Sequence, residues 1–241
     1  MVNPFSADMV NRNSAPDEPR VPTSFILARL RTETRDAHKD LERVLDLLGI
    51  TLTRDLYCRR LGQYHGFYGP LEAALRIRCA MRDEHGDDTS SHIASLIPRL
   101  HKTTLLQQDL RQLLVSTTGL PLCHDLPSLE TPAEVLGCFY VLEGATLGGR
   151  MIAQHIQATL GITPTTGGSF FEGYAGETGT MWHAMRHILV TCAVDVDTEN
   201  VIVANAIATF TCLRHWCEPD GGAAADSTDN ADGHMRANLR A

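Results

Sequence analysis

The sequence predicts a single all-α domain built as a bundle of several helices. Three observations support this fold class. Apolar residues recur at helical spacing through most of residues 24–217, and two stretches have the residue chemistry of helix starts. Alternating patterns typical of β-strands are absent from the sequence, apart from short apolar pieces that fit either structure. Hydrophobic residues make up 43% of the 241 residues, enough for the sizeable core of one domain.

The first helix is predicted over residues 24–48, with Gly49 ending it. A second helix follows Thr53, whose side chain suits the N-cap position, and runs to about Met81. Another is predicted over residues 104–115. The first of these helices carries an apolar stripe at i, i+3, i+4 and i+7 spacing: Leu27, Leu30, Thr34, Ala37, Leu41, Leu45 and Leu48.

The clearest helix start is the run Thr131-Pro132-Ala133-Glu134. It places threonine at the N-cap, proline at the first helical position and glutamate three residues after the cap. The helix that follows is predicted to continue to Leu160 and to end at Gly161. Residues 180–193 and 198–217 give the last two predicted helices.

The flanks are expected to be disordered tails, at residues 1–23 and 218–241, because they are rich in small and polar residues and show no period. The formal net charge of −8 argues against a general nucleic-acid binder. No apolar run approaches the roughly 20 residues of a membrane span, and the N-terminus lacks the apolar segment of a secretory signal. The seven scattered cysteines are expected to be reduced thiols in a cytoplasmic protein.

A histidine on the first predicted helix is a candidate metal ligand. His38 lies at the edge of the apolar stripe, with Arg31 two turns before it and Glu42 one turn after it. A neutral imidazole there could ligate heme iron, the arginine could pair with a heme propionate, and the glutamate could orient the ring. The alternative is a histidine at the edge of the core, bonded to a neighbour.

Three glycines interrupt the helix predicted from Pro132 to Leu160. Gly144, Gly148 and Gly149 together cost roughly 3 kcal/mol relative to alanine, so something must offset them. Gly144 and Gly148 share one face, on which a flat ligand could touch main chain directly. Close helix packing or a kink without a ligand is the alternative. An imidazole on one helix and a bare backbone on another together fit the two walls of a heme site.

A basic cluster begins the helix predicted at residues 180–193. Arg186 could clamp a propionate, and His183 or His187 could add hydrogen bonds. The i, i+4 spacing of the two histidines also fits a metal ion, and an ordinary solvated face remains open.

Several of these segments resemble heme oxygenases. Leu30-Arg31-x-x-Thr34-x-x-x-His38-x-x-x-Glu42 resembles the family's proximal helix, and Gly144-x-x-x-Gly148-Gly149 its distal helix, with Glu143-Gly144 and Leu147-Gly148 similar to the bacterial branch. Leu52-Thr53-Arg54-Asp55 with Tyr64-His65-Gly66-Phe67-Tyr68 looks like the helix between them. Phe170-Phe171 to His187 looks like a region of further propionate contacts. The resemblance spans about residues 24–217.

The resemblance implies a fold that holds heme between the first helix and the glycine-rich helix. It implies that His38 is the axial ligand of the iron, that Arg31 anchors a propionate, and that Gly144, Gly148 and Gly149 form part of the catalytic site. The implied reaction opens heme with O₂ and an external reductant to give biliverdin, carbon monoxide and ferrous iron. The chain has no nucleotide-binding glycine motif, so a ferredoxin or an NAD(P)H-dependent reductase would donate the electrons, and a bacteriophytochrome could receive the biliverdin.

Two positions depart from the family pattern. Ala145 stands where many members carry an aspartate that organises proton delivery, which leaves Tyr64, Thr146 and Glu143 as the nearby polar groups. The family's tyrosine near the start of the distal segment aligns with Phe139, one residue before Tyr140.

Three other functions remain open from the sequence. A two-iron carboxylate oxidase would need repeated Glu-x-x-His ligands, which the sequence lacks. A heme or bilin carrier or sensor would bind without turnover. A purely structural bundle would bind no heme tightly.

Overall fold

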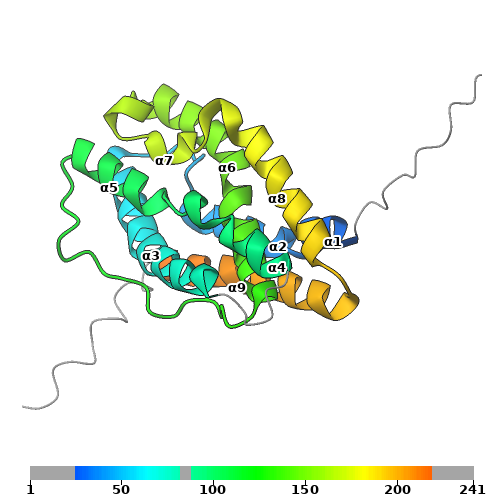
Figure 1. The fold of residues 1–241 in the computed structure, drawn as a ribbon. Coiled ribbons are helices and arrows are strands. Elements are labelled where there is room, and N and C mark those ends of the chain that lie inside the picture. The colour runs from blue at the N-terminus through cyan, green and yellow to red at the C-terminus, as the bar shows by residue number, and fades with distance from the viewer. Residues whose placement is uncertain (1–24, 82–87, 219–241) are drawn as a thin grey trace, which may run out of the picture.

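The computed structural model describes residues 25–81 and 88–218, and all regular secondary structure in this part of the chain is helical. The predicted all-α fold class is confirmed (Figure 1). The predicted tails lie outside the described residues, except for Glu218. The α-helices are α1 (Phe25–Glu33), α2 (Arg35–Leu45), α3 (Arg54–Ala80), α4 (Asp88–Ala94), α5 (Lys102–Gln112), α6 (Pro132–Leu160), α7 (Ser169–Glu172), α8 (Thr178–Cys192) and α9 (Val196–Cys217). Short 3₁₀ helices lie at Ile97–Arg99, Pro164–Thr166 and Ala175–Glu177.

Helix α6 is the centre of the bundle and packs against α9, α8 and α7 (Figure 1). The N-terminal half of α6 is almost wholly apolar and buried. It is also long and apolar enough to cross a membrane by those two criteria, alone among helices of the described residues, but 56% of the relevant window is buried inside the fold. That burial is expected of the core helix of a bundle, which is apolar on most of its sides.

The two predicted N-caps, Thr53 and Thr131, are confirmed. The Thr131 hydroxyl accepts a hydrogen bond from the Glu134 amide at 3.2 Å, and the Glu134 carboxylate accepts one from the Thr131 amide at 2.8 Å. This reciprocal pair satisfies two amides that the helix itself leaves without partners. Gly161 ends α6 in the left-handed region, at φ +68°, as predicted. Thr53 caps α3 through a hydrogen bond from the Leu56 amide.

The prediction of one helix over residues 24–48 is wrong in two respects. The segment forms two helices that meet at Thr34, whose hydroxyl donates to the carbonyl oxygen of Leu30 at 2.6 Å. A hydroxyl that hydrogen-bonds to the preceding turn competes with the backbone and bends a helix. The second helix then ends at Leu45, because Asp46 takes the left-handed C-cap conformation at φ 49° that was expected of Gly49.

Smaller differences affect the later helices. Helix α5 covers Lys102–Gln112 and not residues 104–115, and α8 and α9 each begin two residues before their predicted starts. Helices α4 and α7 were not predicted at all. Both are shorter than two full turns, too short to show a hydrophobic period.

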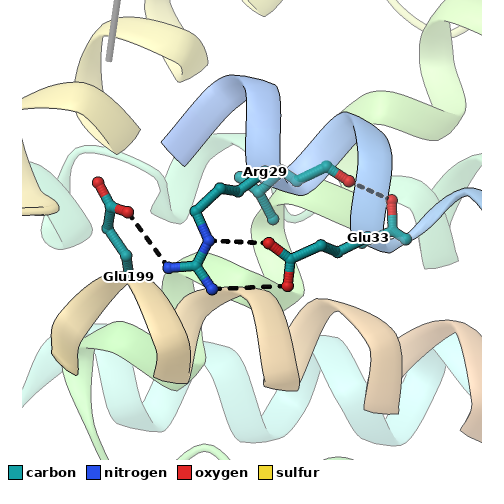
Figure 2. A network of polar contacts seen from close by, with 5 residues as sticks. Arg29, Glu33 and Glu199 are labelled. Carbon is teal, nitrogen blue, oxygen red and sulfur yellow. Dashed lines mark hydrogen bonds and ion pairs between the residues drawn. The ribbon is translucent and has the colours of Figure 1, made fainter. Parts of the chain in front are cut away.

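An ion-pair network joins the start of the chain to α9. Figure 2 shows the Arg29 guanidinium between two carboxylates, with Nε 2.8 Å from Glu33 Oε1 and Nη1 3.2 Å from Glu199 Oε2. Because these groups remain accessible to solvent, they orient α1 on α9 more than they stabilise the fold.

Arg60 of α3 connects the C-terminal ends of two helices. Its guanidinium donates to the carbonyl oxygens of Val44 and Leu45 at the end of α2, and to that of Cys217 at the end of α9 at 2.7 Å. The last carbonyls of a helix have no partner within the helix, and a cation there is favourable. This single side chain therefore fixes the end of α2 relative to α9.

Replacing Arg60 by methionine is expected to lower the free energy of unfolding by about 1.5–3 kcal/mol, the usual effect of losing hydrogen bonds to a charged group. Urea denaturation of the protein without ligand measures the change. The exposed neighbour Arg59 provides the control, and Arg59→Met is expected to stay within about 0.5 kcal/mol of wild type. Equal stability of the two variants would contradict this role for Arg60.

Candidate functional site

A cavity of about 500 Å³ is lined by α2 and α6, with α7 and α9 contributing aromatic and aliphatic side chains. This volume lies within the range of roughly 300–1,000 Å³ that is usual for ligand pockets. Most of the lining is apolar. The polar groups gather in two places, the α2 wall and the side formed by α5 and α6, so an occupant would meet two different environments.

His38 projects from α2 into this cavity. Its side chain is 50% accessible to solvent, more than the predicted position at the edge of the core would suggest. Its ring meets Phe210 of α9 edge to face at 5.4 Å. Its Nδ1 lies 3.6 Å from Glu42 Oε2, which leaves Nε2 as the ring nitrogen available to a ligand. An imidazole held in this way by an aromatic ring and a carboxylate has the usual setting of a histidine metal ligand.

Three cations line the cavity on the same side as His38. Arg31, predicted from sequence, is joined by Arg35 and Lys39, which were not predicted. The three residues follow one another at four-residue intervals and are exposed. The four-residue spacing was the available signal, although Arg31 lies on α1 and the other two cations lie on α2. Together they form a positive edge suited to carboxylates.

His183 and Arg186 lie outside the lining of the cavity. Both are exposed on α8, and Trp182 is the α8 residue that lines the cavity instead. The structure therefore brings Arg31 together with His38, and it does not bring His183 or Arg186 to them.

The three glycines of α6 all line the cavity, but they meet different surroundings. A Cβ atom at Gly148 would have no heavy atom within 4 Å, and one at Gly144 would lie in ordinary contact with Trp182 at 3.8 Å. A Cβ atom at Gly149 would lie 2.5 Å from the carbonyl oxygen of Phe171, far too close. Gly144 and Gly148 therefore leave the cavity wall bare, whereas Gly149 is required by the contact of α6 with α7.

Helix α7 is held in place by a buried carboxylate. Asp109 of α5 accepts hydrogen bonds from the Ser169 amide at 2.9 Å, the Ser169 hydroxyl at 2.7 Å and the Phe170 amide at 2.8 Å. This fixes Phe170 and Phe171 where they line the cavity beside Tyr64. Burial raises the pKa of Tyr64 well above its usual value, so its phenol stays protonated.

A buried polar cluster lies behind the α6 wall. Glu143, only 1% exposed, accepts hydrogen bonds from Arg99 Nη1 and from the Tyr174 hydroxyl, each at 2.8 Å. Beside this cluster Lys102 reaches the cavity lining. Glu143 was predictable as a polar group near the site, but Arg99 and Lys102 were not, since nothing local in the sequence places them near α6.

The two-iron alternative needs several carboxylates and histidines gathered around the metals. Within residues 25–81 and 88–218, no group of three or more His, Cys, Asp or Glu side chains is placed to hold a metal ion. His183 and His187 accordingly find no third ligand in this part of the chain.

Comparison with known proteins gives a consistent answer. Residues 24–219 match the family model described as heme oxygenase. Among curated proteins no match is found.

Solved structures share the fold. The NO- and CO-bound heme oxygenase from Neisseria meningitidis superposes with a TM-score of 0.66 at 16% identity, covering 88% of this chain and 98% of that one. Heme oxygenase from Leptospira interrogans gives 0.62 at 19%, covering 80% and 98%. Heme oxygenase-2 from Synechocystis, in complex with heme and NO, gives 0.61 at 21%, covering 80% and 83%. At these identities the likeness shows the fold alone.

Proposed function

Because the chain belongs to the heme oxygenase family, we propose that the cavity lined by α2 and α6 is where it binds heme and opens the ring to biliverdin, carbon monoxide and iron. The observation that supports this assignment most strongly is that two different helices form separate parts of the cavity lining. An accessible imidazole, His38, stands on α2, while α6 offers a wall left bare by Gly144 and Gly148. A flat apolar ligand with a central metal and carboxylates at one edge fits these residues and the three cations beside them.

His38 is proposed as the axial ligand of the iron, through Nε2. Glu42, 3.6 Å from Nδ1, orients the ring and makes the imidazole a better donor. The contact with Phe210 restricts the ring on its other side. When bound, heme supplies the iron that activates O₂ and is itself the substrate. The chain's own contribution is to hold the ring, exclude bulk water with its aromatic lining and place hydrogen-bond donors.

Arg31, Arg35 and Lys39 are proposed as the partners of the propionates. They lie on the α2 side of the cavity and remain solvated, so each can adjust to a carboxylate. His183 and Arg186, which the sequence also suggested for this role, would contact only groups that project beyond the lining.

Electrons are proposed to come from a separate protein, a ferredoxin or an NAD(P)H-dependent reductase, with O₂ as co-substrate in the cytoplasm. The product fits two uses, as the chromophore of a bacteriophytochrome and as a by-product of iron release. Nothing in the described structure favours the carrier or sensor alternative, which shares the same heme-binding requirements.

Turnover tests the proposal. The purified protein with one equivalent of hemin should form a Soret complex that decays when a reductant is added in air, leaving a product that is identified as biliverdin by chromatography. A Soret complex that survives reduction unchanged would favour a carrier. Failure to form any complex would exclude heme as the ligand.

A further inference from the structure

Lys102 is a buried lysine that the proposed function leaves without a role. It is the first residue of α5, it is 5% exposed, and it lines the same cavity as His38. The sequence contains only two lysines among its 21 lysine and arginine residues, Lys39 and Lys102, and both line this cavity. A fully buried lysine is rare unless it is paired or used.

The carboxylates nearest to Lys102 are already engaged with other groups. Glu72 of α3 accepts the backbone amides of Lys102 at 2.7 Å and of Thr103 at 3.3 Å, so it caps α5. Glu143 of α6 is bound by Arg99 and Tyr174. Within the described residues the ammonium makes no hydrogen bond or ion pair of its own.

The remaining neighbours of the ammonium are aromatic. Its Nζ lies 5.8 Å from the centre of the Tyr174 ring, which in turn packs against His101 at 5.4 Å. Burial lowers the pKa of Lys102, while the charges of Glu143 and Glu72 oppose that shift. The positive end of α5 also disfavours a cation at its first residue. The ammonium of Lys102 is therefore a charged donor whose hydrogen-bonding capacity is not used by its neighbours.

Lys102 and the proposed axial ligand reach the cavity from different parts of the fold. Its neighbours Glu143 and Tyr174 adjoin α6 and α7, whereas His38 stands on α2 and packs against α9. Ala145, also in the α6 lining, has no polar side-chain atom. Lys102 is therefore a cation of the lining close to Glu143 of α6, a helix whose own residue at position 145 supplies no hydrogen-bond donor.

We propose that the Lys102 ammonium is the hydrogen-bond and proton donor to the ligand that occupies the α6 side of the heme. This inference rests on the proposed function and names a residue for proton delivery that the sequence left unassigned. A proton that leaves Nζ for the ligand leaves a neutral amine, which regains a proton from water entering the cavity; the residue moves no electrons. Arg99 is unsuitable, because a guanidinium does not release its proton and Glu143 already holds it.

Fluoride binding to the ferric hemin complex tests the hydrogen bond independently of turnover. Lys102→Met is expected to weaken fluoride binding at least about tenfold, as for loss of a hydrogen bond to a charged donor. Arg111→Met, the matched control at an exposed cation of the same helix outside the cavity lining, should leave fluoride affinity unchanged. Lys102→Arg should keep most of the fluoride affinity yet lose turnover, since it retains the donor but not the releasable proton.

The stability of the protein without hemin separates this role from a structural one. Because burial disfavours the charge, Lys102→Met should be at least as stable as wild type at neutral pH. Relative to Lys102→Met, the wild type should gain stability as the pH approaches 10.5, the ordinary lysine value, because folded Lys102 has then released a proton that the unfolded state still holds. The advantage of Lys102→Met should shrink over the same range.

Unchanged fluoride affinity in Lys102→Met, with normal hemin binding, would overturn the role of Lys102 alone. A strongly destabilised Lys102→Met would show a structural residue and overturn it as well. Failure of the wild type to bind hemin would instead overturn the proposed function on which this inference rests.

Discussion

Replacing His38 by alanine is expected to remove the proposed axial ligand of the bound iron and to reduce turnover by roughly 100-fold or more, equivalent to about 2.7 kcal/mol of barrier. The absorption and electron paramagnetic resonance spectra of the ferric complex should change together with the rate. Half of the His38 side chain is accessible, so the fold itself should be little affected. The measurement is the spectrum of the hemin complex, followed by its decay under reductant.

Two controls define the role of His38. Free imidazole should restore the spectrum and part of the turnover of His38→Ala, because it can enter the space that the side chain leaves. His124→Ala, a change at an exposed histidine outside the cavity lining, should behave as wild type. A wild-type spectrum and rate in His38→Ala would show that another residue ligates the iron.

Filling the bare wall of α6 is the second change with a large expected effect. In Gly148→Leu the new Cβ meets no heavy atom within 4 Å, and the rest of the side chain extends into the cavity lining. Crowding of a site commonly costs about 1–3 kcal/mol, so hemin affinity should fall roughly 5- to 150-fold. The protein without hemin should keep or slightly gain stability, since leucine suits a helix better than glycine.

Gly149→Ala is the contrasting variant. Its Cβ would lie 2.5 Å from the Phe171 carbonyl oxygen, so α7 would have to move and the protein without hemin should melt at a lower temperature. Hemin titration and thermal unfolding of both variants measure the two effects. Normal hemin affinity in Gly148→Leu would mean that the heme does not approach the α6 side of the cavity at Gly148.

The helices that carry their own end signals could be predicted from sequence. The run Thr131 to Glu134 and the glycine at 161 define α6 through interactions between residues at most four apart. The break at Thr34 is local too, but a threonine inside a helix can hydrogen-bond to the preceding turn or simply face solvent, and sequence does not choose between them. Helix α7 depends on Asp109, 60 residues before Ser169, and such a contact has no local signal.

The candidate site divides in the same way. His38 and Arg31 were predictable because both belong to one periodic segment, which lines the cavity although it folds as the two helices α1 and α2. The three glycines of α6 were predicted as a group. Only their surroundings show that Gly149 allows α6 to pack against α7, whereas Gly148 faces open space in the cavity. Arg99 and Lys102 are close in sequence, but Glu143 lies 44 residues after Arg99, so their cluster could not be predicted without the fold.

A crystal structure of the hemin complex tests the central assignment most directly. The predicted result is one heme in the cavity lined by α2 and α6, with His38 Nε2 on the iron and Gly148 against the opposite face of the ring. Arg31, Arg35 or Lys39 should lie beside the propionates, and Lys102 should lie on the α6 side. Heme bound elsewhere, or ligated in this cavity by a residue other than His38, would contradict the assignment.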